Sequence, residues 1–168
     1  MILPLLGKAP KIGEGSFVAP SADIIGDVQI GKGCSIWFNT TLRGDVMPIL
    51  IGDQTNIQDN SVIHGTFKKC GAVIGSRVTI GHSVILHGCK VGDLVLVGMG
   101  SVIMDLADIP ARSIVAAGSL VTEGSKFPEG HLILGRPAKA VRLLNSEELA
   151  FLDKSADNYI EYMSWYTR

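Results

Sequence analysis

The sequence is poor in aromatic residues and in charge of one sign, and each shortage excludes a class of protein. Aromatic residues make up 6% of the 168 residues while glycine occurs 20 times, which argues against an ordinary helical bundle. The net charge is −1 and no run of five like charges occurs, so we expect neither a nucleic-acid partner nor a polybasic membrane-binding patch. The length suits one domain with a sizeable core.

Long hydrophobic runs and cysteine pairs are also lacking. No apolar run approaches the length of a membrane span. The first fifteen residues have no charged n-region and contain Pro4 and Pro10, so we expect no signal peptide. Cys34, Cys70 and Cys89 are odd in number and far apart, which fits neither a disulfide framework nor a CxxC zinc site. These features predict a cytoplasmic protein.

What the sequence has instead is an aliphatic residue at every sixth position. The aliphatic series comprises Val18, Ile24, Ile30, Ile36, Leu42, Ile51, Ile57, Ile63, Ile74, Ile80, Val91, Val97, Ile103, Ile109, Val115 and Val121. Ile85 and Leu86 compete for one further place. Four positions after most of these residues comes a small or slim side chain, in Ala22, Val28, Cys34, Thr40, Val46, Val95, Ser101, Ala107, Ser113 and Ser119.

A period of six residues is typical of neither a helix nor a hairpin sheet. It predicts a chain that coils through short parallel strands, each six-residue unit forming one side of a prism. Aliphatic residues then fill the interior, and the slim residues let the chain turn the corners. Three sides give a coil of about 18 residues, so we predict an all-β fold, a parallel β-helix of the hexapeptide class over roughly residues 10–123.

The residues after the repeat predict one helix. Segment 135–144 turns the chain back, Asn145 or Ser146 can cap a helix, and Glu147 and Glu148 suit its positive N-terminus. One apolar stripe follows, formed by Leu149, Leu152, Ala156, Ile160 and Met163. We therefore expect residues 1–144 to form the β-helix domain and residues 145–168 to form a C-terminal helix of the same domain, packed on a prism face.

Three irregularities in the repeat decide where the histidines lie. Three extra residues separate Leu42 from Ile51, five extra separate Ile63 from Ile74, and one is missing between Ile80 and Val91. If Leu86 continues the period, His87 lies directly over His64, with Arg43 one coil below. If Ile85 continues it, His87 is one step off that ladder. We favour the first register because it explains the histidines.

Two imidazoles stacked on neighbouring coils can share one metal ion. His82 belongs to another side of the prism, above Asp59 and near Gln58, so it can reach that ion only from a second chain. The pattern therefore predicts a cyclic homotrimer in which His64 and His87 of one chain and His82 of its neighbour bind a shared metal ion. A lone histidine is more often a surface residue, and His131, outside the repeat, is assigned that bland role.

Two charged segments flank these positions. Arg43 would lie close to a dication and so needs a carboxylate to anchor it, either Asp45 or an aspartate such as Asp59. We expect an ion-pair network at the subunit interface. Lys68 and Lys69 lie in the five-residue insertion and are expected to form a solvated turn.

Three motifs, "LRGD", "IGDQTNIQDNSVIHG" and "IGHSVILHGC", occur in this order and resemble the gamma-class carbonic anhydrases and their gamma-carbonic-anhydrase-like relatives. The resemblance implies a left-handed β-helix and reversible hydration of CO2 to bicarbonate by a metal-bound hydroxide at trimer interfaces. It also implies Zn2+ as the metal, with Fe2+ or Co2+ as alternatives.

The resemblance also assigns roles to single residues. The metal ligands are His64, His82 and His87, and Arg43 and Asp45 form an intersubunit ion pair. Gln58 is similar to the side chain that orients the metal-bound water, and Asn56 to its neighbour. Tyr159 is similar to a tyrosine near the active site, with Tyr162 as a rival.

The sequence departs from the best-known active pattern in two places. Segment "GTFKKCGA" after His64 lacks the glutamates that export the proton, and Val46 follows "RGD" where another glutamate is expected. Proton export would then fall to buffer and water. Alternative functions remain open: a CoA-dependent acyltransferase, a CoA-thioester hydrolase, or a metal-binding trimeric scaffold with weak or no hydratase activity.

Overall fold

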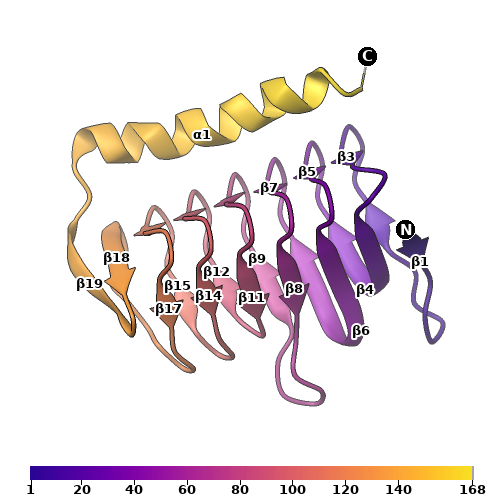
Figure 1. The fold of residues 1–168 in the computed structure, drawn as a ribbon, viewed down its shortest axis with the longest axis horizontal. Coiled ribbons are helices and arrows are strands. Elements are labelled where there is room, and N and C mark those ends of the chain that lie inside the picture. Colours follow the sequence, from indigo (N-terminus) through magenta and orange to yellow (C-terminus); the bar gives the residue numbers. More distant parts are fainter. Residues whose placement is uncertain (168) are drawn as a thin grey trace.

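A computed structural model describes residues 1–167 of the chain. The six-residue period forms a triangular prism of short strands (Figure 1). The first side contains β1 (Ile2–Leu3), β8 (Val62–His64), β11 (Ile85–His87), β14 (Val102–Ile103) and β17 (Leu120–Val121). The second side contains β2 (Lys11–Ile12), β9 (Ala72–Ile74), β12 (Lys90–Val91) and β15 (Asp108–Ile109). Two long strands, β4 (Asp23–Ile30) and β6 (Thr41–Ile51), bend from the first side to the second.

The third side forms a separate sheet. It contains β3 (Phe17–Val18), β5 (Ser35–Ile36), β7 (Asn56–Ile57), β10 (Thr79–Ile80), β13 (Leu96–Val97), β16 (Ile114–Val115), β18 (His131–Gly135) and β19 (Ala138–Leu143). All its pairings are parallel except β18 with β19. The predicted fold class, a left-handed parallel β-helix, is therefore confirmed.

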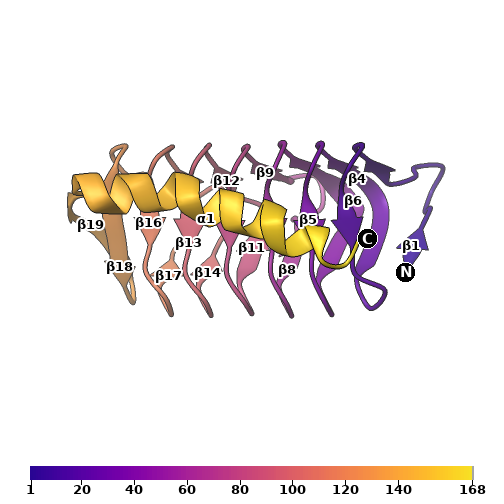
Figure 2. The same ribbon diagram turned by 90° about the horizontal axis from the view of Figure 1, so that it is seen from above.

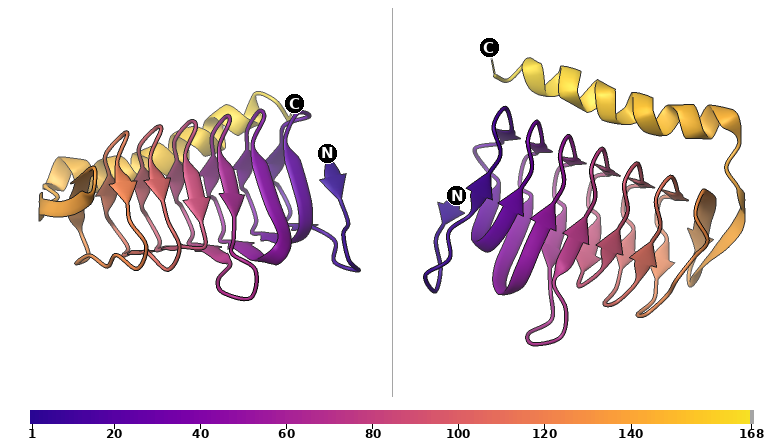
Figure 3. Two further views of the ribbon diagram at one scale, coloured as in Figure 1. Left: turned by 60° about the horizontal axis from the view of Figure 1, so that its bottom comes forward. Right: turned by 180° about the vertical axis from the view of Figure 1, so that it is seen from behind.

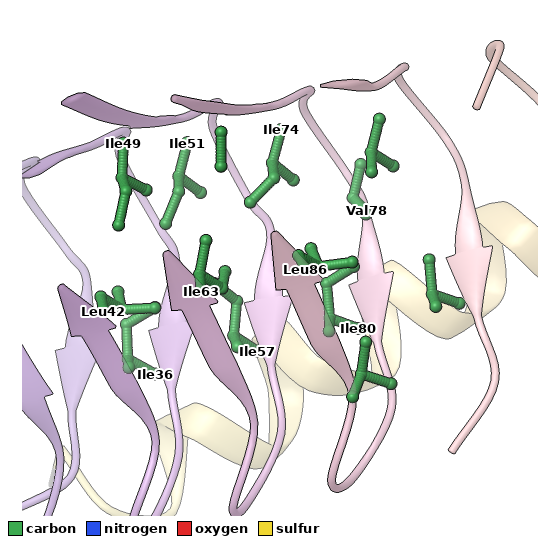
Figure 4. Close-up of a cluster of buried hydrophobic side chains, with 14 of the residues drawn as sticks. Ile36, Leu42, Ile49, Ile51, Ile57, Ile63, Ile74, Val78, Ile80 and Leu86 are labelled. Carbon is green, nitrogen blue, oxygen red and sulfur yellow. The ribbon is translucent and has the colours of Figure 1, made fainter. Parts of the chain in front are cut away.

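The aliphatic series fills the prism as the period predicts. Figure 4 shows Ile57, Ile63, Ile80 and Leu86 pointing into the interior from successive coils. From Ile24 to Val121, every aliphatic residue assigned without ambiguity is 5% exposed or less. The slim residues Cys34, Thr40 and Ser101 are fully buried at the corners. Burial of this continuous column of aliphatic side chains is the main force that stabilises the fold.

Two details of the predicted repeat are wrong. Val46 is only half buried, and Ile49 occupies the corner position in its place, paired with Val28. The three extra residues after Leu42 displace the corner by that number. The repeat also continues beyond residue 123, because β18 pairs with β16 through Ile133 and Val115. His131 therefore lies within the last coil, where its Nδ1 donates to the carbonyl of Glu129 at 2.8 Å.

The C-terminal helix α1 (Ser146–Ser164) runs back along the prism from the β18–β19 end toward β5 (Figure 2). Asn145 caps it: its side chain accepts from the Glu148 amide, and the Glu148 side chain accepts from the Asn145 amide. Within the predicted stripe, Leu152, Ala156 and Met163 are buried and Leu149 and Ile160 are half buried. The helix contacts β5 and β10, so it covers the third side.

One loop leaves the prism. Residues 65–71, between β8 and β9, extend beyond the neighbouring coils (Figures 1 and 3). Thr66 and Cys70 form an isolated antiparallel bridge at its base. Among residues 1–167, no helix is long and apolar enough to cross a membrane.

Candidate metal centre

His64 and His87 face each other on the first side of the prism. β8 and β11 pair in register, with Leu86 opposite Ile63 and His87 opposite His64. Leu86 is fully buried whereas Ile85 is 40% exposed, so the missing residue falls after Leu86 as predicted. The Nδ1 atom of His64 lies 3.3 Å from the Nε2 atom of His87.

Each of these rings is bound through its other nitrogen by a carboxylate. Asp45 Oδ1 lies 2.9 Å from His64 Nε2, and Asp105 Oδ1 lies 2.6 Å from His87 Nδ1. Burial raises the pKa of the Asp45 carboxyl, but hydrogen bonds from His64 and Arg43 outweigh it and lower the pKa below its usual value. Burial likewise opposes ionisation of Asp105, yet hydrogen bonds from Thr66, His87 and Lys69 hold its pKa well below the usual range. Both carboxylates are therefore ionised and accept from the rings.

This arrangement selects one tautomer for each ring. Because His64 donates through Nε2 and His87 through Nδ1, the two nitrogens that face each other both carry lone pairs in the neutral rings. Neither can donate to the other. Two lone pairs at 3.3 Å repel unless a cation or a proton lies between them.

The donor set fits a zinc ion. Two nitrogens that bind one tetrahedral zinc ion at about 2.0–2.1 Å lie about 3.3 Å apart. The distance between His64 Nδ1 and His87 Nε2 is 3.3 Å. A carboxylate on the outer nitrogen of each ring is also the usual companion of a metal-binding histidine. The pair therefore has the geometry of half a zinc site.

His82 lies elsewhere, in the turn after β10 on the third side. Its Nδ1 is 2.7 Å from Asp59 Oδ2, and its side chain is 45% exposed. Asp59 therefore binds one ring nitrogen of His82, as Asp45 binds one ring nitrogen of His64. The other nitrogen of His82, Nε2, is then available to bind a metal ion. Within the described residues of one chain, no three His, Cys, Asp or Glu side chains are placed to hold a metal ion together. A three-histidine site would need a second chain.

Arg43 and Asp45 form an ion pair within one chain. Asp45 is thereby shared between Arg43 and His64. The predicted need for a carboxylate beside Arg43 is met by Asp45, while Asp59 is used by His82. The arginine side chain remains 43% exposed.

Gln58 and Asn56 belong to a buried hydrogen-bond chain on the third side. Gln58 Nε2 donates to Asn56 Oδ1 at 3.1 Å, and Asn56 Nδ2 donates to Thr79 Oγ1 at 2.9 Å. Thr79 in turn bonds Ser155 of α1 at 3.0 Å. Gln58 and His82 both line a groove of about 360 Å³ beside the helix. Through Ser155, Thr79 and Asn56, the helix therefore helps to hold the Gln58 side chain at the groove that His82 also lines.

Tyr159 lies about one helical turn after Ser155, the residue of α1 that lines this groove. Its ring packs edge-on against Trp37, with the ring centroids 5.8 Å apart. Burial, with a smaller contribution from Asp59, raises the pKa of Tyr159 to about 12, so its hydroxyl stays protonated. Tyr162 packs on Tyr159 at 5.3 Å.

The expectation that Lys68 and Lys69 form only a solvated turn is wrong for Lys69. Its Nζ lies 2.6 Å from Glu123 Oε1 and 3.2 Å from Asp105 Oδ2. A loop that lacks carboxylates of its own is bound by carboxylates from later coils.

Asp105 is the site residue that sequence reasoning missed. It follows His87 by 18 residues, the length of one coil, and this spacing is the signal that identifies it. The signal is weak because the missing residue near His87 shifts the local register.

Known proteins with similar sequences and structures have the same hexapeptide-repeat fold. The family model described as bacterial transferase hexapeptide (six repeats) matches residues 9–44 and 71–105. The structure of a hexapeptide transferase family protein from Anaplasma phagocytophilum superposes with a TM-score of 0.95 at 49% identity, covering 99% of this chain and 98% of that one. The chain is a hexapeptide-repeat protein.

Relatives of similar sequence show to which group of hexapeptide-repeat proteins the chain belongs. A carbonic anhydrase of Geobacillus kaustophilus is 45% identical over 99% of this chain and 91% of its own length. Gamma carbonic anhydrase 2, mitochondrial, of Arabidopsis thaliana is 45% identical over 95% of this chain, which spans 59% of that protein. The chain belongs to the gamma-carbonic-anhydrase-like hexapeptide-repeat family.

Proposed function

We propose that this protein catalyses the metal-dependent reversible hydration of CO2 to bicarbonate at sites shared between the subunits of a homotrimer. The observation that carries the proposal is the 3.3 Å approach of His64 Nδ1 to His87 Nε2, with an ionised aspartate on the far nitrogen of each ring. The relatives named carbonic anhydrase support the same chemistry.

In this proposal His64 and His87 of one subunit and His82 of its neighbour hold Zn2+, and the same nitrogen donors also suit Fe2+ or Co2+. When bound, such an ion lowers the pKa of a coordinated water toward about 7 and so supplies hydroxide at neutral pH. Asp45, Asp59 and Asp105 keep one nitrogen of each imidazole free for the ion.

Gln58 would orient the attacking oxygen. Its Nε2 donates to Asn56, so its Oε1 is the atom that can accept a hydrogen bond from a hydroxyl group. Asn56 is itself held by Thr79, which keeps the amide plane of Gln58 from rotating. We assign Tyr159 to the wall of the site, where its protonated hydroxyl can donate a hydrogen bond.

Arg43 and Asp45 are proposed to lie at the subunit interface. The Arg43 side chain is 43% exposed beside Asp45, so a neighbouring chain can approach this ion pair. In the proposed trimer, groups of that chain would share the charges of the pair. The segment after His64 contains no carboxylate to carry a proton away, and buffer is expected to serve instead.

Metal content and CO2 hydration test the proposal together. We expect about one zinc ion per chain in the wild type, and loss of that zinc in His87→Ala and in His82→Ala. Stopped-flow measurements should show a metal-dependent hydration rate in the wild type that both variants lose. His131→Ala is the matched control, since His131 bonds only a local carbonyl in this structure, and it should retain metal and rate.

Other outcomes would favour the alternatives. A metal-free trimer that binds acetyl-CoA would contradict the proposal and indicate an acyltransferase. The description of the Anaplasma relative names a hexapeptide transferase family, without saying which group is transferred. A metal-loaded protein with no hydration rate above buffer would leave a CoA-thioester hydrolase or a non-catalytic scaffold. Thioester hydrolysis measured on the same preparation separates those two.

A further inference from the structure

Asp105 contacts three polar side chains from two separate parts of the chain. It follows β14 and is 8% exposed. Its Oδ1 lies 2.6 Å from His87 Nδ1, while its Oδ2 accepts from Thr66 Oγ1 at 2.6 Å and lies 3.2 Å from Lys69 Nζ. Both donors to Oδ2 come from the loop 65–71. The two oxygens therefore have separate partners, one facing the histidine and the other facing the loop.

The loop is itself held in place. The Thr66 amide donates to the Cys70 carbonyl at 2.9 Å, and the Lys69 amide donates to the Thr66 carbonyl at 3.0 Å, so the loop closes on itself. Lys69 also reaches Glu123 on a later coil at 2.6 Å. These contacts tie the loop to the coils that follow His87.

Gly88 permits the close approach of these groups. It has a φ of +55°, and a Cβ there would overlap Cys70 Sγ and lie 2.7 Å from Asp105 Oδ1. The residue after His87 must therefore lack a side chain for the loop and Asp105 to meet behind the imidazole.

Without the contacts from the loop, the Asp105 carboxylate could rotate, and Oδ1 would no longer be held against His87 Nδ1. If the carboxylate rotates away from His87 Nδ1, the ring can adopt the other tautomer, with its proton on Nε2. A protonated Nε2 has no lone pair to offer a metal ion. Thr66 and Lys69 both occupy Oδ2, so Oδ1 stays directed at His87 Nδ1. These contacts favour the tautomer in which His87 carries its proton on Nδ1 and its lone pair on Nε2.

We propose that Asp105, oriented by Thr66 and Lys69 of the 65–71 loop, is the positioning residue that presents His87 Nε2 to the metal. The inference rests on the proposed function, because it takes His87 as a ligand. It gives the insertion after His64 a task different from proton export, since the loop anchors the carboxylate behind the other histidine.

Zinc affinity measured by competition with a chelator tests this assignment. We expect Asp105→Asn to weaken zinc binding 10–100-fold and Thr66→Val to weaken it roughly tenfold, while Thr66→Ser, which keeps the hydroxyl, stays near the wild type. Asp108→Asn and Thr122→Val are matched controls, since neither residue contacts His87, Asp105 or the 65–71 loop through the bonds of its side chain, and both should bind as the wild type does. Circular dichroism and gel filtration verify folding and assembly, and if Asp105→Asn does not fold, the Thr66 pair decides.

The tautomer of His87 in metal-free protein is a second readout that a purely structural role would not move. Long-range 1H–15N spectra should place its proton on Nδ1 in the wild type and show a mixture of tautomers in Asp105→Asn and in Thr66→Val. Zinc binding by Thr66→Val or folded Asp105→Asn equal to the wild type would overturn the inference while leaving the metal site intact. A wild type that binds no zinc would overturn the proposed function as well.

Discussion

Ile85 and Leu86 show how one position decides where a site forms. Both satisfy the six-residue period, and the choice between them moves His87 on or off the ladder of His64. The structure buries Leu86 completely and leaves Ile85 40% exposed. Because successive residues of a strand point to opposite faces, His87 then lies outside the prism, in register with His64.

Truncation of these two neighbours should have unequal effects. Leu86→Ala empties a closely packed interior position and should cost about 2–5 kcal/mol of the free energy of unfolding. Ile85→Ala removes a side chain that already contacts solvent, so it should cost well under half as much. Urea unfolding of both variants measures the difference. A larger loss for Ile85→Ala than for Leu86→Ala would mean that Ile85, not Leu86, points into the core.

The three aspartates behind the histidines differ in how readily they could be predicted. Asp45 and Asp59 lie in motifs that drew attention to them as carboxylates near Arg43 and His82. Asp105 stands in an ordinary-looking segment of the repeat, and its pairing with His87 depends on a turn whose path the missing residue alters. Local sequence around Asp105 carries no sign of its role.

Helix α1 illustrates an element whose start could be predicted well, whereas its end, expected at residue 168, lies at Ser164. Asn145, one of two candidate caps, begins it, and Glu148 completes a capping box and also pairs with Arg142 at 2.7 Å. The apolar stripe faces the third side as expected because its spacing follows the helical period. The contact between Ser155 and Thr79, which braces Asn56, was not predictable from that stripe.

The Glu148 carboxylate should make the stability of the protein depend on pH. The hydrogen bond from Arg142, followed by that from the Asn145 amide, lowers the pKa of Glu148 from 4.5 to about 2. The ionised group therefore stabilises the folded state above about pH 4.5, and this stabilisation is lost as the pH falls toward 2. Glu148→Gln should accordingly be less stable than the wild type at pH 7, with the gap narrowing in that acidic range.

Urea unfolding at pH 7 and at pH 3 measures this gap. Asn145→Ala is a useful comparison because it removes an uncharged cap, and its cost of about 1 kcal/mol should persist at both pH values. A gap for Glu148→Gln that is the same at both pH values would contradict the assignment of the ion pair.

At the scale of the proposed trimer, the three histidines of one site have to come from two chains. His64 and His87 lie on the first side of the prism and His82 lies in the turn after β10 on the third. The proposed site is therefore complete only where two chains meet, and each subunit contributes to two different sites.

Mixed trimers test this sharing directly. Neither His82→Ala nor His87→Ala alone can form an intact site, but a His82→Ala chain beside a His87→Ala chain forms one. With random mixing of equal amounts, about a quarter of the wild-type zinc content and hydration rate should return. A mixture of His64→Ala with His87→Ala is the matched control, since both residues belong to the same half-site, and it should regain nothing. Equal recovery in the two mixtures would show that the half-sites are assigned wrongly.

The sequence by itself determined the β-helix, because a six-residue period of aliphatic residues leaves the chain few other ways to bury them. It also limited the helix cap to Asn145 or Ser146 and the position of His87 to two registers, of which the one that stacks His87 over His64 was favoured. Only the tertiary structure decided that Asp105, Thr66 and Lys69 converge behind His87. These residues meet across an insertion and a shortened coil, and a contact between side chains of different coils depends on the path of the backbone rather than on its period.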